Sequence, residues 1–119
     1  LTRLGSCLED ASSLHTLVLS RNSISKISQL EIPTLETLDL SYNRIGDASG
    51  LENLSRLRWL NLSHNRVEKL LALRPLVPLG TAQLTDVDLT ANHVVRVPRY
   101  RAALVEMIPS IKCLDGEPV

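Results

Sequence analysis

Four segments of this 119-residue chain repeat one pattern of leucines around an asparagine. Each segment reads L-x-x-L-x-L-x-x-N-x-I/V, except that Val87 stands once in place of a leucine. A short unit of this kind cannot bury its apolar side alone, so successive units must stack into one continuous core. The segments are 14–24, 35–45, 57–67 and 84–94.

The spacing of the leucines predicts one short strand in each unit. In the first unit, Leu17 and Leu19 lie on the same side of an extended chain and point into the core. Apolar residues make up 44% of the chain but aromatic residues only 3%, so the core must consist of leucine, isoleucine and valine. We expect parallel strands near 16–19, 37–40, 59–62 and 86–89.

An asparagine follows each predicted strand where the chain turns away. Its short side chain carries both a donor and an acceptor, so it can satisfy backbone groups that no neighbouring strand reaches. We therefore expect a buried structural ladder of asparagines, hydrogen-bonded to the backbone, rather than a set of ligands or glycosylation sites. Its members are Asn22, Asn43, Asn65 and Asn92.

The segments between the strands should form the outer, convex side. Pro33, Pro75 and Pro78 argue against long helices there, which favours 3₁₀ turns or short helices. The third unit is longer than the others, and its extra residues lie in 74–83. We expect this insertion to bulge or to form a longer helix and loop.

The length of the chain suits one domain with its own core. We expect a single repeat domain over 1–119, with a partial first repeat at 1–13, four repeats over 14–96 and a C-terminal cap over 97–119. Because the first residue is leucine rather than methionine, we expect the chain to be a fragment of a longer protein. The residues expected to cover the last coil are Tyr100, Leu104, Ile108, Ile111 and Leu114.

The tail also carries the pattern YR…P-x-x-x-x-LDG, made by Tyr100, Arg101, Pro109, Leu114, Asp115 and Gly116. With the repeats, it resembles the intracellular leucine-rich repeat proteins of the short-unit subfamily. That subfamily includes a protein phosphatase-1 regulatory subunit, the spliceosomal A-prime protein, the acidic nuclear phosphoproteins and an axonemal dynein light chain. The resemblance implies an α/β fold, a right-handed solenoid with a parallel concave sheet. It also implies an intracellular protein, in the cytoplasm, nucleus or cilium, that is not secreted.

No constellation in the sequence predicts an enzyme, a metal site or a cofactor. His15, His64 and His93 do not stand at zinc-like spacings, and there is neither a G-x-S-x-G elbow nor a glycine-rich phosphate loop. The 13 basic and 13 acidic residues cancel, which argues against direct nucleic-acid binding. No apolar run is long enough to cross a membrane. We expect a protein that is monomeric alone and has a protein partner.

Residues that alternate with the buried leucines should face the concave side. The only tryptophan, Trp59, falls there, and tryptophan is enriched at binding hot spots. We expect Trp59 to anchor a partner protein, although its ring could instead lie flat and shield the sheet. An arginine beside Tyr42 can form a cation–π pair. The other candidate partner-binding residues are Tyr42, Asp39, Asn61, Asp86, Asp88, Arg58, Arg21 and His64.

Three functions remain open at this point. The first is a scaffold or adaptor that binds a partner protein on its concave face. The second, implied by the resemblance, is a ribonucleoprotein component that binds an RNA-recognition-motif protein. The third is a regulatory subunit of a phosphatase or of a ciliary or cytoskeletal motor. The rival binding surface is the convex insertion 74–83.

Overall fold

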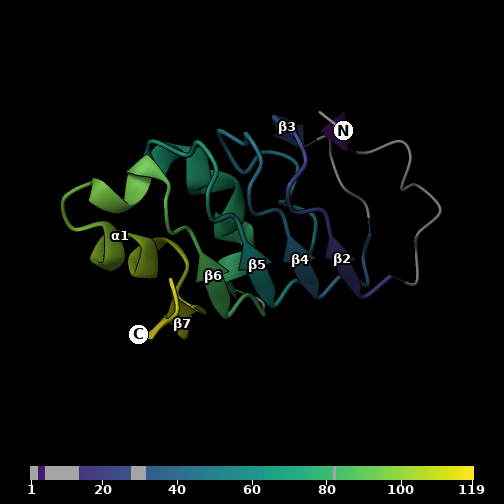
Figure 1. The fold of residues 1–119 in the computed structure, drawn as a ribbon. Coiled ribbons are helices and arrows are strands. Elements are labelled where there is room, and N and C mark those ends of the chain that lie inside the picture. Colours follow the sequence, from purple (N-terminus) through teal and green to yellow (C-terminus); the bar gives the residue numbers. More distant parts are fainter. Residues whose placement is uncertain (1–2, 5–13, 28–31, 82) are drawn as a thin grey trace.

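The computed structural model describes residues 3–4, 14–27, 32–81 and 83–119. Their main feature is a six-stranded sheet in the order β2-β4-β5-β6-β7-β8, whose strands follow the chain in a row (Figure 1). The strands are β2 (Thr16–Val18), β4 (Thr37–Asp39), β5 (Trp59–Asn61), β6 (Asp86–Asp88), β7 (Cys113–Leu114) and β8 (Glu117–Pro118).

The first five strands of this sheet are parallel, and β8 pairs antiparallel with β7. The four strands expected from the repeats are confirmed, but β7 was not predicted. It continues the pattern of the earlier coils. The backbone N–H groups of Arg58 and Trp59 donate to the carbonyl oxygen of Glu36, and those of Lys112 and Cys113 donate to the carbonyl oxygen of Thr85.

A second, two-stranded sheet joins β1 (Arg3–Leu4) to β3 (Lys26–Ile27) in parallel. This pairing was also not predicted, because neither strand carries the leucine pattern. Residues 5–13, which the sequence assigns to the rest of the partial first repeat, lie outside the described residues.

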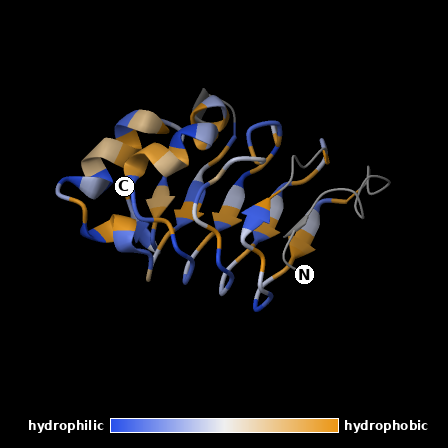
Figure 2. Ribbon diagram, turned by 90° about the horizontal axis from the view of Figure 1, so that it is seen from above, coloured by the Kyte–Doolittle hydropathy of each residue, from blue (hydrophilic) through white to orange (hydrophobic). Residues whose placement is uncertain are grey.

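The core contains the leucines that alternate along each strand. Leu38 and Leu40 of the second coil and Leu60 and Leu62 of the third are fully buried. Hydrophilic turns follow the ends of the strands along one edge (Figure 2). Burying one leucine side chain stabilises the fold by about 1.5–3 kcal/mol, so the repeated leucines dominate its stability.

Among the described residues, the convex side carries the 3₁₀ helices η2 (Leu70–Thr81) and η3 (His93–Arg96) and the α-helix α1 (Tyr100–Met107). The expected 3₁₀ structure is confirmed, and η2, which has 12 residues and includes Pro75 and Pro78, is the longer helix that was one alternative for the insertion 74–83. A 3₁₀ helix has about 3.0 residues per turn, so leucines spaced by three stay on one face. The residues on that face are Leu70, which is half-buried, and the buried Leu73, Leu76 and Leu79.

Both prolines of η2 fall on another face of the same three-residue period, outside the buried row. The insertion 74–83 is therefore largely helical and contributes Leu76 and Leu79 to the core. Shortening it would remove core residues, so it is a poor test of a binding surface.

Candidate functional site

Trp59 stands in the middle strand of the concave sheet. In register, it pairs with Thr37 of β4 on one side and with Asp86 of β6 on the other. Strands lie about 4.8 Å apart, so side chains from both neighbours flank the indole ring. Trp59 keeps 36% of its surface exposed, which leaves part of a large apolar ring open to a partner.

The next outward-facing register contains Val18, Asp39, Asn61 and Asp88. Oδ1 of Asp39 accepts hydrogen bonds from the backbone N–H of Ser41 at 3.0 Å and from its hydroxyl at 2.7 Å. Oδ1 of Asp88 likewise accepts from the N–H and the hydroxyl of Thr90, at 2.9 and 2.8 Å. These side chains therefore close the ends of their own strands as well as facing the concave side.

Each of these carboxylates uses only one oxygen in this way. Among the described residues, Oδ2 of Asp39 and Oδ2 of Asp88 have no hydrogen-bond partner. Asp86 adds a third carboxylate, whose Oδ1 accepts from the Thr85 hydroxyl at 2.7 Å. The surface around Trp59 is therefore acidic, with oxygens available to a cationic group.

Val18 is the apolar residue that the candidates named from the sequence leave out. It is 61% exposed and lies on the first strand of the sheet, in register with Asp39. Alternation along the strand was enough to place it, but its small side chain gave no binding signal of its own. It extends the apolar part of the concave face away from Trp59.

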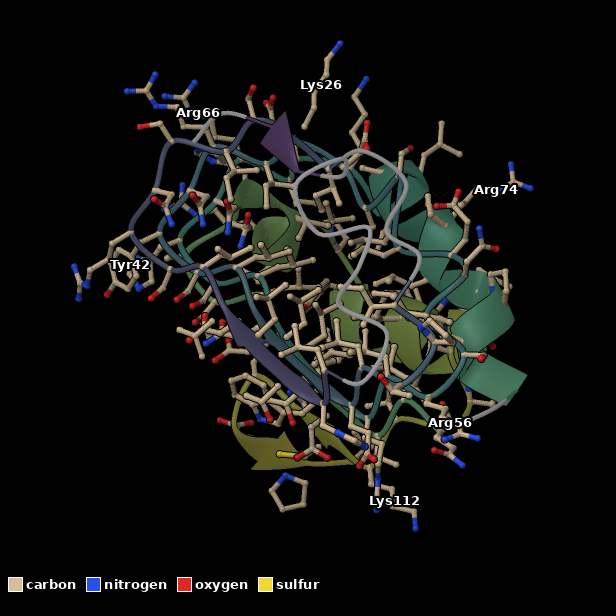
Figure 3. The ribbon with its side chains drawn as sticks, turned by 90° about the vertical axis from the view of Figure 1, so that its right-hand side faces the viewer. Lys26, Tyr42, Arg56, Arg66, Arg74 and Lys112 are labelled. Carbon is tan, nitrogen blue, oxygen red and sulfur yellow. The ribbon has the colours of Figure 1, made fainter. Side chains whose placement is uncertain are left out.

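A second group of candidates forms a stack where the strands end. The Arg21 guanidinium carbon lies 4.3 Å from the centre of the Tyr42 ring, which gives the expected cation–π pair. The Tyr42 and His64 rings lie parallel within 8°, with their centres 4.1 Å apart. Tyr42 stands at the end of its strand, at one edge of the molecule (Figure 3). The structure thus brings Arg21, Tyr42 and His64 together in one stack, which is separate from the candidates around Trp59.

The residues of this stack share a left-handed backbone. Arg21, Tyr42 and His64 have φ of 59°, 57° and 56°, and Ala91 in the fourth coil has φ of 60°. Such backbone is costly for residues other than glycine. Because Ala91 adopts it without any stacking partner, this backbone belongs to the turn of the repeat and not to the stack.

The carbonyl oxygen of Arg58 accepts from the backbone N–H of Asp86 at 3.0 Å, so Arg58 lies beside the acidic group along the chain direction. It precedes β5 and lines a hollow at the edge where the strands begin, together with Thr85, Ser110 and Lys112. Among the described residues, the Arg58 side chain forms no ion pair with the carboxylates of Asp39, Asp86 or Asp88.

The asparagines connect neighbouring coils. Oδ1 of Asn43 accepts from the backbone N–H of Ile24 at 3.1 Å, and its Nδ2 donates to the carbonyl oxygens of Leu19, Leu40 and Ser41. Asn65 and Asn92 repeat this arrangement and are also buried.

Asn22 differs from the other asparagines, because it is only half-buried, and the expectation that it is buried is wrong. Each buried asparagine lies against the coil before its own. Asn22 stands in the first of the four full repeats, and its described contacts are to the carbonyl oxygens of Leu19 and Ser20 in that same repeat.

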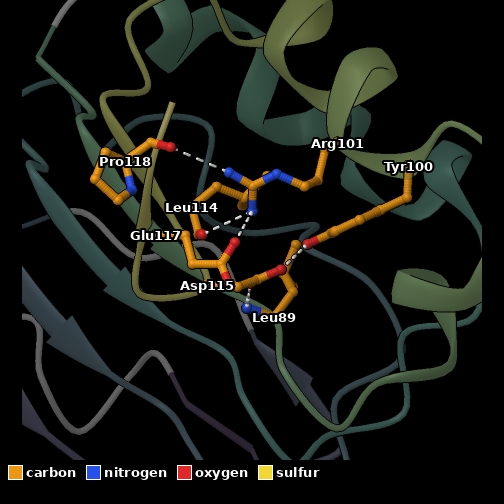
Figure 4. A network of polar contacts seen from close by, with 7 residues as sticks. All are labelled: Leu89, Tyr100, Arg101, Leu114, Asp115, Glu117 and Pro118. Carbon is orange, nitrogen blue, oxygen red and sulfur yellow. Dashed lines mark hydrogen bonds and ion pairs between the residues drawn. The ribbon is translucent and has the colours of Figure 1, made fainter.

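The cap contains a polar network that the predicted apolar cover does not include (Figure 4). Oδ1 of Asp115 accepts from the Leu89 N–H at 2.6 Å, and its Oδ2 accepts from the Tyr100 hydroxyl at 2.8 Å. Arg101 donates to the carbonyl oxygens of Leu114 and Pro118 and pairs with Glu117 at 3.8 Å. Burial, and then the hydrogen bond to Asp115, raise the pKa of Tyr100.

The network explains the spacing of the YR and LDG residues in the tail. Asp115 has φ of 55° and Gly116 of 81°, which forms the turn between β7 and β8. Of the five cap residues named from the sequence, Tyr100 and Leu114 take part in this network. Leu104, Ile108 and Leu114 are fully buried, and Tyr100 and Ile111 are exposed by only 5% and 4%.

Neither a metal centre nor a membrane span is found in the part of the chain that the structure describes. No three His, Cys, Asp or Glu side chains gather there in a way that could hold a metal ion. Within the same ranges, no helix has both the length and the apolar character needed to cross a membrane.

A family model described as "Leucine-rich repeat" matches residues 1–119. The chain belongs to the leucine-rich repeat family. The resemblance drawn from the repeats and the tail is thereby confirmed. This leucine-rich repeat chain is also 39% identical, over 72% of its length, to acidic leucine-rich nuclear phosphoprotein 32 family member A of Drosophila melanogaster. It is 33% identical, over 92% of its length, to the centrosomal protein of 72 kDa of Mus musculus.

Among solved structures, the chain is similar to one in the Drosophila melanogaster SNF/U2A' complex. The TM-score is 0.84 and the identity 31%, over 92% of this chain and 63% of that one. This likeness confirms the solenoid with its parallel sheet. The chain spans 33% of the length of the fly phosphoprotein and 18% of that of the mouse centrosomal protein.

Proposed function

We propose that this leucine-rich repeat domain is a non-catalytic module that binds a partner protein on its concave face, with Trp59 as the anchor. The observation that carries the proposal is the partly exposed indole ring at the centre of a rigid sheet. Large aromatic side chains surrounded by other contacts are where binding energy concentrates. The solved relative U2A' is in a complex with SNF, which supports a protein partner.

The chemistry of the concave face favours a partner segment that carries lysine or arginine. Asp39, Asp86 and Asp88 surround Trp59, and each uses one carboxylate oxygen within its own coil. The remaining oxygens can accept hydrogen bonds from a cation of the partner. These charges affect the rate of association and its salt dependence more than the affinity.

The test compares affinity purifications of the full-length protein with and without Trp59→Ala, followed by calorimetry with each recovered partner. Loss of an anchor should weaken binding by about 2 kcal/mol or more, or roughly thirtyfold. Thr16→Ala is the matched control, because Thr16 occupies the same register on β2. The proposal fails if Trp59→Ala binds like the wild type while its melting curve is unchanged.

The turn stack of Arg21, Tyr42 and His64 is the next part of the proposed surface. Tyr42 is 42% exposed and stacked on both sides, so its orientation is fixed before a partner arrives. Tyr42→Ala should weaken binding less than Trp59→Ala does, because the stack lies at the edge of the sheet. The same calorimetry measures this order.

We also infer that the domain works inside the cell and has no enzymatic activity of its own. The names of the relatives, a nuclear phosphoprotein and a centrosomal protein, support an intracellular site. The proposed domain organisation is one unit of four repeats over 14–96 between a partial first repeat and a cap. An activity screen on the full-length protein tests the absence of catalysis.

A ribonucleoprotein component is the second candidate function, favoured by the likeness to the U2A' chain. In that case the partner on the concave face is itself an RNA-binding protein. Filter binding with labelled RNA distinguishes this function from that of a module that binds only protein. RNA retained only when the recovered partner is present supports this function, whereas RNA retained by this protein alone contradicts the proposed protein-only contact.

A further inference from the structure

The convex side has a step where the second coil meets the third. The second coil is short there and carries Gly46, Asp47 and Ser49, whereas the third coil continues into the long helix η2. The Ala48 N–H donates to the carbonyl oxygen of Ala72 at 2.9 Å, which joins the short coil to η2 at the base of the step. A Cβ added at Gly46 would meet no atom within 4 Å, so the space above it is open.

The step forms a hollow of about 540 Å³, lined on one side by the second coil and on the other by Leu71, Arg74 and Pro75 of η2. A second hollow of about 570 Å³ adjoins it and shares Gly46, Asp47 and Arg66. Together they make one groove, here called the convex groove, which runs from η2 to β3. It lies away from Trp59 and the concave sheet.

Cations dominate the lining of the convex groove. The described residues that line it include two carboxylates, Asp47 and Glu68, and five cations: Lys26, Arg44, Arg66, Lys69 and Arg74. All five cations are exposed. Within the described ranges, the ion pair is Arg101–Glu117, so none of the five is neutralised at salt-bridge distance. A chain with no net charge thus concentrates positive charge on one groove.

The wall of the groove on η2 adds an apolar component. Leu71 and Arg74 line the groove, and Val77 continues the same face of the 3₁₀ helix one turn beyond the lining residues. This face is separate from the face that carries the buried leucines. Leu71 is 65% exposed and Val77 40%. A rise of about 2.0 Å per residue places Leu71 and Val77 about 12 Å apart along the helix, with Arg74 between them.

We propose that the convex groove binds an extended acidic peptide segment of a protein partner, independently of the concave face. Glutamates or aspartates of the segment meet the five cations, and two apolar side chains pack on Leu71 and Val77. In an extended peptide, residues four apart are separated by about 13 Å, which matches the spacing on η2. This is a second surface, and it does not depend on Trp59.

A peptide fits the groove better than a nucleic acid does. The carboxylates of Asp47 and Glu68 lie among the cations and would repel a phosphate backbone, whereas a peptide can place a polar or cationic residue beside them. No aromatic side chain is among the described residues that line the two hollows, so bases would have nothing there on which to stack.

The test uses a fluorescein-labelled synthetic peptide of glutamates with two leucines four residues apart. Its binding to the full-length protein is followed by fluorescence anisotropy at low salt, and its position by amide chemical-shift changes of the isotope-labelled domain. We expect shifts at Gly46, Ser49 and Leu71. The charge-reversal pair Lys69→Glu with Arg74→Glu should weaken binding at least about tenfold, a change of about 1.4 kcal/mol.

The matched control reverses the same number of charges elsewhere, with Arg56→Glu and Lys112→Glu at the opposite edge (Figure 3). This pair and Trp59→Ala should each change the affinity by less than about twofold, whereas Leu71→Ser should weaken it measurably. Equal losses with both charge-reversal pairs would mean a general charge effect and would overturn the proposal. Tighter binding of single-stranded RNA or anionic vesicles at the same groove, or shifts confined to the concave face, would overturn it as well.

Discussion

In the interior coils, the N–H groups of Leu40 and Leu62 donate to the backbone carbonyl oxygens of Asn61 and Asp88 in the next strand. At the end of the solenoid, the corresponding N–H of Leu89 donates to the Asp115 side chain. The N–H group at this register position therefore donates to a backbone carbonyl in the coils and to an aspartate side chain in the cap.

The acceptor differs between the coils and the cap because an interior coil has a full neighbouring strand and the end of the solenoid does not. An interior coil has a neighbour on each side, so identical backbone groups satisfy one another at every repeat. The parallel strand β7 has only two residues, and the chain must then turn back into β8. Asp115 stands at that turn and supplies the acceptor that a longer strand would have provided. Tyr100 and Arg101 hold the turn in place.

The largest expected effect comes from removing the cap. Truncation after Val97 would unpair β6 and leave Leu89 and Val94 facing water, as an open edge beside an apolar patch. The truncated chain should associate or lose cooperative unfolding, as measured by size-exclusion chromatography and thermal melting. Removing only 117–119 is the control, and it should have a much smaller effect. A monomeric truncation that melts like the wild type would show that the coils do not need the cap.

The next largest effect tests the coils. Asn65→Ala leaves the Ile45 N–H and the carbonyl oxygens of Leu40, Leu62 and Ser63 without their side-chain partner, so it should cost about 3 kcal/mol in urea melts. The half-buried Asn22 offers a matched comparison, and Asn22→Ala should cost about 1 kcal/mol. If both variants lose the same free energy of unfolding, burial between two coils does not determine how much an asparagine of the ladder contributes to stability.

A third change tests the acceptor in the cap. Asp115→Ala removes the partner of the Leu89 N–H and should cost about 2 kcal/mol, since hydrogen bonds to charged groups contribute about 1.5–3 kcal/mol. Asp115→Asn keeps an acceptor oxygen for Leu89 and should recover part of the loss. If Asp115→Asn melts like Asp115→Ala, the charge matters in the cap and the acceptor oxygen does not.

The smallest expected change in the free energy of unfolding comes from Tyr100, and it depends on pH. The raised pKa of Tyr100 means that the folded state holds the phenol proton more tightly than the unfolded chain does. Its contribution is therefore complete below the unfolded pKa of about 10 and is lost as the pH rises above that value. Tyr100→Phe should cost about 1 kcal/mol at neutral pH and should flatten the loss of stability above pH ~10. Urea melts at both pH values check this, and parallel losses in the two proteins would contradict it.

Prediction from sequence succeeded where a residue type repeats with a fixed register. The four asparagines and the alternating leucines predicted the strands, and the outward position of Trp59 followed from the burial of Leu60. It failed for β7, since Cys113 and Leu114 follow no repeat. For η2, the prolines predicted 3₁₀ structure, but the sequence alone left open whether the extra residues bulge or form a longer helix.

The candidate site was only partly predictable, because only some of its residues lie at positions that the repeat register fixes. The repeat register alone placed Trp59 between Thr37 and Asp86. Whether Arg58 pairs with these carboxylates could not be predicted, because that depends on where the long side chain of a residue flanking the strand turns; among the described residues it forms no ion pair with them. The convex groove also escaped prediction, since it arises from the difference in length between two coils.

By itself, the sequence determined the stacked repeats, because each leucine has a low free energy only when it is buried and the period of burial matches a strand and a turn. Local periodicity is enough for that. The tertiary structure decided how the solenoid ends and where its surface is hollow. The bond from Leu89 to Asp115 spans 26 residues, and the convex groove lies between coils of unequal length. Such contacts depend on the three-dimensional path of the chain, which no local pattern encodes.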